Sequence, residues 1–322
     1  MLTVGNAVDH LRRRGVLTGG GTATLLTGGV SGVVVLVSAG DRRLVVKQAL
    51  DRLSVATEWL AKPERVLTEA AALALLHDIT PAHTPELVDV DPSALVLTMT
   101  AAPAGWQPWK SVLLDEPPSG ARFAAVALAL GRILAAWHQQ TWGDPAVADR
   151  FADYEAFEQL RVAPFHRVVR ARHPALATAI DACVADLTTA RECLVHGDFS
   201  PKNVLVGPDS PLWVLDFEVA HVGAAVFDLA FLQCHLLLKA VHRPDAAPAL
   251  RAAATAFLTG YGPIPSTRLG WHTACLLLAR VDGTSPADYL TPTARDRVRA
   301  LASAALAAPS SPSIDDLWEA VG

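Results

Sequence analysis

A polar loop enclosed by short apolar runs constrains the fold of this chain more than any other feature. The loop is His196-Gly197-Asp198-Phe199-Ser200-Pro201-Lys202-Asn203, between Cys193-Leu194-Val195 and Val204-Leu205-Val206. A third apolar run, Trp213-Val214-Leu215, leads into Asp216-Phe217-Glu218, thirteen residues after Asn203. Because these runs are β-prone, we expect short strands that hold both polar motifs on rigid loops, where catalytic groups are commonly placed.

The side chains of the two motifs match the needs of phosphoryl transfer. That reaction uses a carboxylate to receive the acceptor hydroxyl proton, and an amide oxygen and a second carboxylate to hold Mg²⁺ over the phosphates. Asp198 supplies the first group, and Asn203 and Asp216 supply the metal ligands. Glu218 is expected to be a further metal ligand, whereas Phe217 faces the core if strand-like alternation continues.

Other residues near the loop are expected to support it. His196 suits hydrogen bonding to the backbone or to the Asp216 region better than proton transfer, and Gly197 permits a tight backbone. Lys202 has two interpretations: contact with the transferring phosphate, or a solvated place at the loop rim. Asp228 suits the start of a helix and could also brace the loop. We expect structural roles for the remaining histidines, since His138, His221 and His235 lack metal-ligand spacing.

A lysine in the first half of the chain adds a phosphate-binding group. Lys47 ends the apolar run Leu44-Val45-Val46 and is one of only five lysines, so we expect it to need a charged partner. Glu69, on a helix expected to pack on this strand, could hold Lys47 toward the α and β phosphates of a nucleotide. The alternative is an edge-strand lysine that points to water.

Gly28-Gly29-Val30-Ser31-Gly32 lies upstream of Lys47, between two β-prone runs. Gly28, Gly29, Gly32 and the Ser31 hydroxyl could fold over phosphates as a hairpin. It is not a Walker loop, because no Gly-Lys-Ser/Thr and no helix follow it. Glycine-rich hairpin turns are common. This segment therefore supports a phosphate-binding role only because it precedes Lys47, Glu69, Asp198 and Asp216 in the chain.

The distribution of periodic segments predicts two lobes. Five β-prone runs and two helical segments occupy residues 1–100, and residues 101–120, rich in Pro, Gly and Trp, lack periodicity and mark a boundary. Beyond it, strong helical patterns cover 121–141, 174–190, 225–241, 247–258, 269–281 and 293–308. We therefore predict an α+β protein with an antiparallel β-sheet N-lobe at 1–100 and a mainly helical C-lobe at 101–322, which carries the catalytic loop, metal site and substrate pocket.

Composition excludes several classes of partner. The 322 residues are 51% hydrophobic and carry a net charge of −5 without basic blocks, which disfavours nucleic acid and anionic membranes. The longest apolar run, Phe123 to Leu130, is far short of the roughly 20 residues of a membrane span. The N-terminus does not resemble a signal peptide, and four widely spaced cysteines show no zinc or redox spacing. A cytoplasmic protein is expected, and its oligomeric state is left open.

On these residues the chain resembles the aminoglycoside phosphotransferase and choline kinase-like superfamily of small-molecule kinases, from near Gly28 to at least Ala240. The run Leu44 to Leu50, with Trp59, Arg65 and Glu69 downstream, looks most like the methylthioribose kinase branch. The resemblance implies a bilobal protein-kinase-like fold that binds ATP and Mg²⁺ between its lobes. It implies Asp198 as base, Asn203 and Asp216 as metal ligands, Lys47 as phosphate anchor and Glu69 as its partner, and a hinge at Leu97–Ala101, including Met99, that holds adenine.

The expected activity is transfer of the ATP γ-phosphate to a hydroxyl of a small molecule: a sugar, amino sugar, nucleoside or amino alcohol. Ser200, and Lys202 where related loops often have glycine, leave the acceptor open. An antibiotic-inactivating phosphotransferase is the alternative, although Asp115-Glu116 is the only local acidic pair, outside the metal site and C-terminal tail, for a polycationic aminoglycoside. An inactive nucleotide-binding pseudokinase is a second alternative, which the complete set of catalytic residues disfavours.

Overall fold

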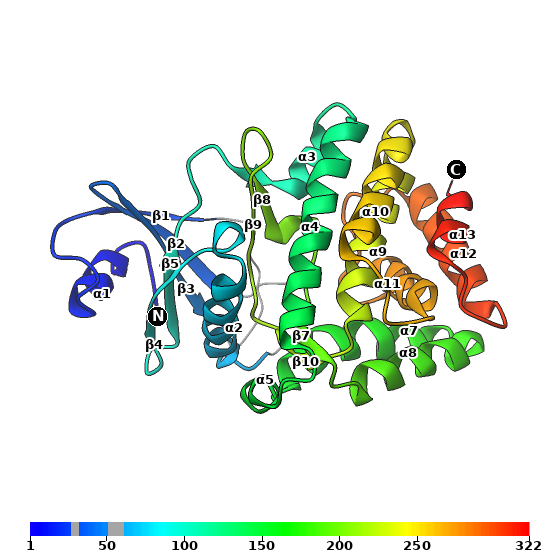
Figure 1. Cartoon of the computed structure of the whole chain (residues 1–322), viewed down its shortest axis with the longest axis horizontal. Helices are drawn as coiled ribbons and strands as arrows, with labels where there is room; N and C mark the ends of the chain where they lie inside the picture. Colours follow the sequence, from blue (N-terminus) through cyan, green and yellow to red (C-terminus); the bar gives the residue numbers. More distant parts are fainter. Residues whose placement is uncertain (27–31, 51–60, 322) are drawn as a thin grey trace. The chain divides into compact units, whose positions relative to one another are not determined.

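The computed structural model of this chain describes residues 1–26, 32–50 and 61–321. The chain divides into two compact units, and Figure 1 labels most of their helices and strands. The first contains Met1–Trp106 and Trp213–Ala220, and the second contains Gln107–Leu212 and His221–Gly322. The first unit therefore includes the Asp216 and Glu218 segment, although the sequence pattern places that segment with the helical lobe.

An antiparallel five-stranded sheet forms the centre of the first unit, in the order β1-β2-β3-β5-β4. Its strands are β1 (Thr22–Leu25), β2 (Gly32–Ala39), β3 (Arg42–Ala49), β4 (Leu87–Asp91) and β5 (Val96–Thr100). The helices are α1 (Ala7–Arg13), α2 (Arg65–Ile79) and the 3₁₀ turn η1 (Pro81–His83). The expected β-prone runs are all strands, although β2 and β3 extend further because they pair along their whole length.

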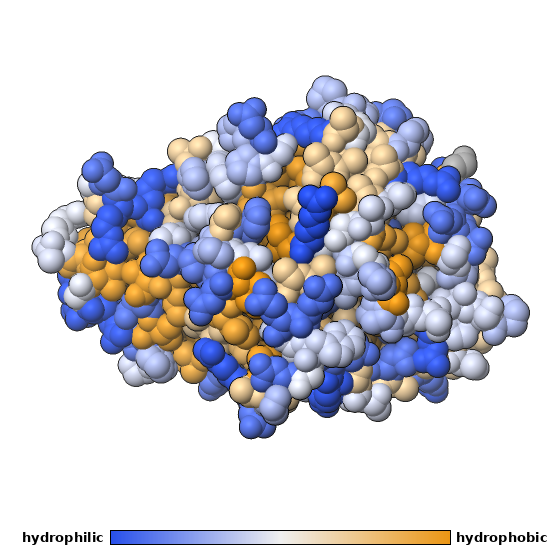
Figure 2. Space-filling model, viewed as in Figure 1, coloured by the Kyte–Doolittle hydropathy of each residue, from blue (hydrophilic) through white to orange (hydrophobic). Residues whose placement is uncertain are grey.

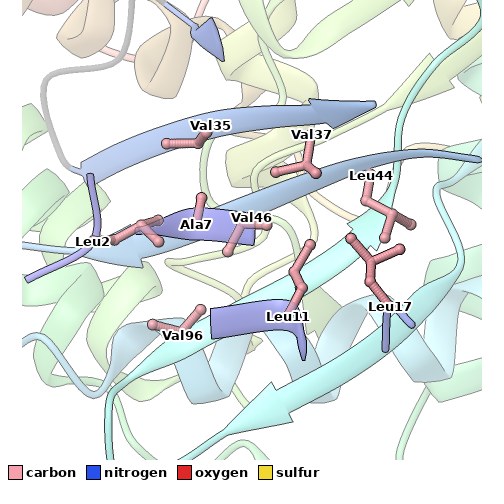
Figure 3. Close-up of a cluster of buried hydrophobic side chains, with 9 residues drawn as sticks. All are labelled: Leu2, Ala7, Leu11, Leu17, Val35, Val37, Leu44, Val46 and Val96. Atoms are coloured by element: carbon pink, nitrogen blue, oxygen red, sulfur yellow. The ribbon is translucent and has the colours of Figure 1, made fainter. Parts of the chain in front are cut away.

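Side-chain alternation in β3 separates a core residue from a site residue. Val46 belongs to the apolar cluster in Figure 3, in which α1 and its flanking residues pack on one face of the sheet. The cluster consists of Leu2, Ala7, Leu11, Leu17, Val35, Val37, Leu44, Val46 and Val96. Since successive side chains point to opposite faces of a strand, Lys47 lies on the other face, where it meets Glu69 of α2.

The second unit is mainly helical. Its longer helices are α4 (Gly120–Thr141), α8 (Ala177–Thr189), α9 (Val226–His242), α10 (Ala247–Tyr261), α11 (Leu269–Asp282) and α12 (Pro292–Ala307). Shorter ones are α3 (Trp109–Asp115), α5 (Pro145–Arg150), α6 (Glu155–Phe157), α7 (Val168–Arg172) and α13 (Ile314–Glu319), with 3₁₀ turns η3 (Pro174–Leu176), η4 (Pro201–Asn203) and η5 (Pro244–Ala246). An antiparallel sheet and a mainly helical unit together confirm the predicted α+β class.

Short strands flank the catalytic-loop motif as expected. β7 (Cys193–Val195) precedes it and pairs antiparallel with β10 (His221–Gly223). β8 (Val204–Val206) follows it and pairs antiparallel with β6 (Gln107–Pro108). β9 (Leu212–Val214) then leads to the Asp216 motif. Both motifs therefore lie on loops that begin or end at a strand.

A glycine contact joins α4 to α10. A Cβ atom on Gly131 would lie 2.1 Å from the Phe257 carbonyl oxygen, and one on Gly260 would lie 2.3 Å from that of Leu128. Glycine therefore lets the two helix backbones approach closely at this crossing. Within the described residues, α4 is also the one helix long and apolar enough to cross a membrane, but half of its most apolar window is buried inside the protein, as in a core helix.

A ten-residue π-helix, η2 (Glu158–Arg167), connects α6 to α7. The sequence pattern predicts no helix here, because Pro164 lacks a backbone donor and normally breaks an α-helix. The wider π turn accommodates Pro164 inside the helix. Since π-helical segments are rare and occur frequently at functional sites, the residues of η2 are candidates for the functional site.

The exposed large apolar side chains of the described residues are scattered along the chain. They are Met1, Val4, Leu25, Leu26, Trp142 and Ile264. On the face drawn in Figure 2, apolar residues gather on the left, over the first unit, and hydrophilic residues are interspersed with apolar ones elsewhere. Single exposed apolar side chains of this kind are normal for a folded protein and need no partner to explain them.

Candidate active site

Lys47 is the centre of a buried charge cluster in the first unit. Its Nζ atom lies 2.7 Å from Glu69 Oε2 and 2.5 Å from Asp216 Oδ1. Lys47 and Glu69 are almost completely buried, whereas about a fifth (22%) of the Asp216 side chain remains exposed. The ammonium group is therefore held between two carboxylates, one from α2 and one from the segment after β9.

A second ion pair, which the sequence does not predict, adjoins the first. Arg65 Nε lies 3.0 Å from Glu218 Oε2, and both side chains are buried. The Arg65 guanidinium also donates to the carbonyl oxygens of Ala61, Lys62 and Leu50. Arg65 is thereby a structural clamp on the chain before α2. Its pairing with Glu218 fixes the position of the Asp216-Phe217-Glu218 segment at that residue.

Three carboxylates in this cluster could hold a divalent cation. Oxygen atoms of Glu69, Asp216 and Glu218 lie within 4.8 Å of one another. Burial disfavours the charged form of Lys47, but Asp216, Glu69 and Glu218 outweigh it and raise the Lys47 pKa. Burial, together with the charges of Asp216 and Glu218, raises the pKa of Glu69 to about 7 against the opposing effect of Lys47. When Glu69 is ionised, three carboxylates face two cations and leave an excess of negative charge, which suits an oxygen-binding ion such as Mg²⁺.

Asp216 adopts an unusual backbone conformation. Its φ is +70°, in the left-handed region that non-glycine residues rarely occupy. Such strain persists only where the surroundings hold the residue in place, and it is typical of functional positions. The next residue, Phe217, is buried as expected from strand-like alternation. The turn therefore buries the aromatic ring while it directs the Asp216 carboxylate to Lys47.

In the second unit, Asp228 organises the catalytic-loop motif. Its completely buried carboxylate accepts hydrogen bonds from the backbone N–H groups of His196, at 2.7 Å, and Gly197, at 2.9 Å. His138 links Asp228 to Tyr261, because its ring nitrogens lie 3.3 Å from Asp228 Oδ2 and 3.0 Å from the Tyr261 hydroxyl oxygen. These bonds brace the start of the loop from α4, α9 and α10.

The rest of the loop is held by its own groups. The Asp198 backbone N–H donates to His196 Nδ1 at 3.1 Å, so His196 orders the loop through the backbone. Gly197 has a φ of +77°, a conformation that explains the glycine. The Asn203 side-chain nitrogen donates to the Asp198 carbonyl oxygen at 3.0 Å. A metal ion at Asn203 would then be bound by the amide oxygen, the only group of this side chain suited to it.

The buried Asp198 carboxylate is paired with two cations. Arg161 Nη2 lies 2.9 Å from Asp198 Oδ2, and Lys202 Nζ lies 2.8 Å from the same atom. Arg161 belongs to the π-helix and also donates to the Gly197 carbonyl oxygen at 2.8 Å. Lys202 is half exposed and lies at the rim of the loop, and its ammonium group pairs with the Asp198 carboxylate. The two cations therefore balance the negative charge of the Asp198 carboxylate.

Arg161 is a site residue that the sequence does not reveal. It lies 37 positions before Asp198, in a segment without a clear helical pattern, and only the fold brings it to the loop. An unusual proline within a charged segment, Glu158 to Arg167, is the one sequence signal that could have drawn attention to it.

The remaining candidates have less distinctive surroundings. Gly32 begins β2, where a Cβ atom would lie 2.7 Å from the Gln48 carbonyl oxygen, so the close pairing of β2 and β3 requires glycine. Met99 lies in β5, paired with Val45 and Leu87, and is mostly buried. Gly28, Gly29 and Ser31 lie outside the described residues, and so does Trp59.

Comparison with known proteins identifies relatives of this arrangement. Residues 22–274 match the model of the "Phosphotransferase enzyme family". No curated protein matches the chain significantly.

Similar solved structures include a putative aminoglycoside phosphotransferase from Ralstonia eutropha, with 14% identity, coverage of 99% and 98% of the two chains, and a TM-score of 0.57. Another is a macrolide 2′-phosphotransferase from Brachybacterium faecium, with 21% identity, 95% and 99% coverage and a TM-score of 0.53. A third, spectinomycin phosphotransferase in complex with ADP and spectinomycin, has 12% identity, 99% and 94% coverage and a TM-score of 0.50. At these identities the similarity shows a shared fold.

Proposed function

Because the chain belongs to the phosphotransferase enzyme family, we propose that it is an active ATP-dependent kinase that transfers the γ-phosphate to a hydroxyl of a small molecule. The charge cluster around Lys47 and the catalytic loop around Asp198 have different roles in this reaction. Lys47, held by Glu69, contacts the nucleotide phosphates, while Asp216, Glu218 and Asn203 hold Mg²⁺. When bound, Mg²⁺ would neutralise negative charge on the phosphates.

Asp198 orients the acceptor hydroxyl and receives its proton. A loose transition state demands little basicity from this residue, so its position counts for more than its proton affinity. Arg161 and the Asp228 brace fix the loop and the carboxylate, which keeps the attacking oxygen in line. Lys202 is exposed enough to move from Asp198 to the transferring phosphoryl group. Tight positioning of Asp198 is the single observation that carries this proposal.

The experiment is a screen of hydroxyl-bearing metabolites and antibiotics with ATP and Mg²⁺, read by a mass gain of one phosphate. Asp198→Ala is expected to lower turnover by several orders of magnitude and leave ATP binding nearly intact. Asp149→Ala, at an exposed position of α5, is the matched control and keeps full activity. Full activity of Asp198→Ala would refute the assignment. A wild-type protein that binds ATP but neither transfers nor slowly hydrolyses the γ-phosphate would be a pseudokinase.

The acidic pair Asp115-Glu116 offers little to a polycationic acceptor. The Glu116 carboxylate pairs with Arg122 and also accepts from the Gln107 side chain at 2.6 Å. The charge of Glu116 is therefore already balanced by Arg122, which weakens the alternative of an aminoglycoside acceptor.

A further inference from the structure

A group of cationic side chains surrounds Tyr289 in the second unit. Lys110 Nζ lies 5.8 Å and Lys239 Nζ 5.7 Å from the Tyr289 ring centroid, both within cation–π range. Lys110 comes from α3 and Lys239 from α9. Arg280 of α11 is close enough to Tyr289 and Lys239 for its charge to act on both, and His235 of α9 is close to Lys239 and Arg280 in the same sense. Lys110, His235, Lys239, Arg280 and Tyr289 are called the Tyr289 cluster.

The Tyr289 cluster lacks an acidic partner within the described part of the chain. Lys239 is 1% exposed, and its Nζ donates to the His235 carbonyl oxygen at 3.3 Å. No ion pair of the described residues includes Lys110, Lys239 or Arg280, and the neighbouring Asp288 is exposed. A buried ammonium group without a counter-ion is costly, so the arrangement is explained if a ligand supplies the negative charge.

Hydrogen-bond donors in the cluster are also unused. Arg280 Nη1 donates to the Ser285 carbonyl oxygen, but the buried Arg280 Nε and the Tyr289 hydroxyl have no hydrogen-bond partner among the described residues. Buried polar groups are nearly always satisfied, and unsatisfied ones call for an explanation. Burial and the charges of Lys110 and Arg280 lower the pKa of Lys239 to about 7, so an arriving anion readily restores its proton.

A series of side-chain contacts leads from this cluster to Asp198 within the same unit. The Arg161 guanidinium, 2.9 Å from Asp198, lies 5.6 Å from the Phe231 ring centroid. The Phe231 and His235 ring centroids are 5.2 Å apart. Phe231, His235 and Lys239 follow one another at four-residue steps on α9 and so share one face. The α3 helix, which carries Lys110, packs against η4 of the catalytic loop.

We propose that the Tyr289 cluster binds an anionic group of the acceptor, so that the substrate is a small hydroxyl compound carrying a carboxylate or a phosphate. This inference rests on the proposed kinase function and specifies its substrate class. Arg280 and Tyr289 would donate hydrogen bonds to the anion, while Lys110 and Lys239 supply charge. The same cations repel polycationic and quaternary-ammonium acceptors.

The test sorts the acceptors found by the screen by charge. The best acceptor is expected to carry a carboxylate or a phosphate. Comparing the kcat/KM values of carboxylate-bearing and phosphate-bearing acceptors identifies which of the two anions the cluster binds. Its neutral methyl ester or dephosphorylated analogue should lose about tenfold or more in kcat/KM. Lys239→Met should raise the acceptor KM by a similar factor and leave the ATP KM unchanged. Arg132→Met, at an exposed position of α4, is the control.

Methionine at 239 is nearly isosteric with lysine and is expected to be tolerated, and Arg280→Gln provides a second variant. A neutral or cationic best acceptor, or an unchanged acceptor KM in both variants, would overturn the inference and leave the kinase function intact. If no compound is phosphorylated, the kinase proposal fails. The anion-binding inference is then tested by binding of inorganic phosphate. With saturating ADP and Mg²⁺, inorganic phosphate should then raise the melting temperature of the wild type more than that of Lys239→Met, and equal shifts would overturn it.

Discussion

Arg161 Nη2 lies 2.9 Å from Asp198 Oδ2, and the π-helix around Pro164 is the element that presents Arg161. The same guanidinium binds the Gly197 carbonyl oxygen, so one side chain positions both the carboxylate and the backbone beside it. Arg161 is therefore a positioning residue for the proposed base.

Arg161→Met is expected to lower kcat roughly 100-fold, because the loss of positioning moves Asp198 from its attacking geometry, while the KM for ATP stays unchanged. Steady-state kinetics with a fixed acceptor measure both constants. Arg161→Lys should restore part of the rate. Arg167→Met is the matched control on the same π-helix, where an exposed pair with Glu158 is lost. Equal losses in both methionine variants would show that Arg161 acts only through the fold.

Asp216→Asn is expected to raise the Mg²⁺ concentration for half-maximal activity by about tenfold or more, the scale of changes around a bound metal. The substitution removes one charge from the Glu69, Asp216 and Glu218 set. A Mg²⁺ titration at saturating ATP measures the effect. Asp209→Asn, also at a residue with positive φ, keeps the wild-type titration. An unchanged titration for Asp216→Asn would contradict its role as a ligand.

Gly131→Ala is expected to destabilise the protein by about 1–3 kcal/mol, as overpacking typically does. The new methyl group would lie 2.1 Å from the Phe257 carbonyl oxygen, and backbone of α10 would have to move. Alanine favours helix, so a gain in stability would show that this contact relaxes easily. Gly120→Ala is the control in the same helix, because nothing lies within 4 Å of its added atom. Chemical denaturation gives both values.

Acid is expected to destabilise the fold through His166. Burial, followed by the charge of His272, lowers the His166 pKa from 6.5 to about 3. The unfolded chain therefore binds the proton more tightly, so this stabilising contribution is present above pH 6.5 and is lost as the pH falls toward 3. The free energy of unfolding should fall by up to about 1.4 kcal/mol per pH unit through this one group.

Unfolding titrations of His166→Phe at several pH values test this expectation. The variant should have a shallower loss of stability between pH 6.5 and pH 4 than the wild type. His235, whose pKa burial also lowers, retains part of the dependence in the variant. An identical slope in the two proteins would exclude His166 as a contributor.

Local patterns explain which elements could be predicted. The helix expected around Glu69 is α2, Arg65–Ile79, because its apolar spacing and the preceding Pro63 are features of the segment alone. The π-helix and α3 could not be predicted in the same way. Pro164 opposes an ordinary α-helix, and α3 lies within the Pro-rich segment that lacks periodicity. Packing against other parts of the second unit stabilises both.

By itself the sequence determined the order and identity of the chemical groups, since the loop from His196 to Asn203 and the Asp216 motif are contiguous and their chemistry depends on residue type and spacing. Tertiary structure decided which charges meet. Lys47 pairs with Asp216 across 169 positions, Arg65 pairs with Glu218 across 153, and Arg161 reaches Asp198 from a helix without a sequence signature. The physical reason is that an ion pair depends on distance in space, which folding sets, whereas a motif depends only on neighbours along the chain.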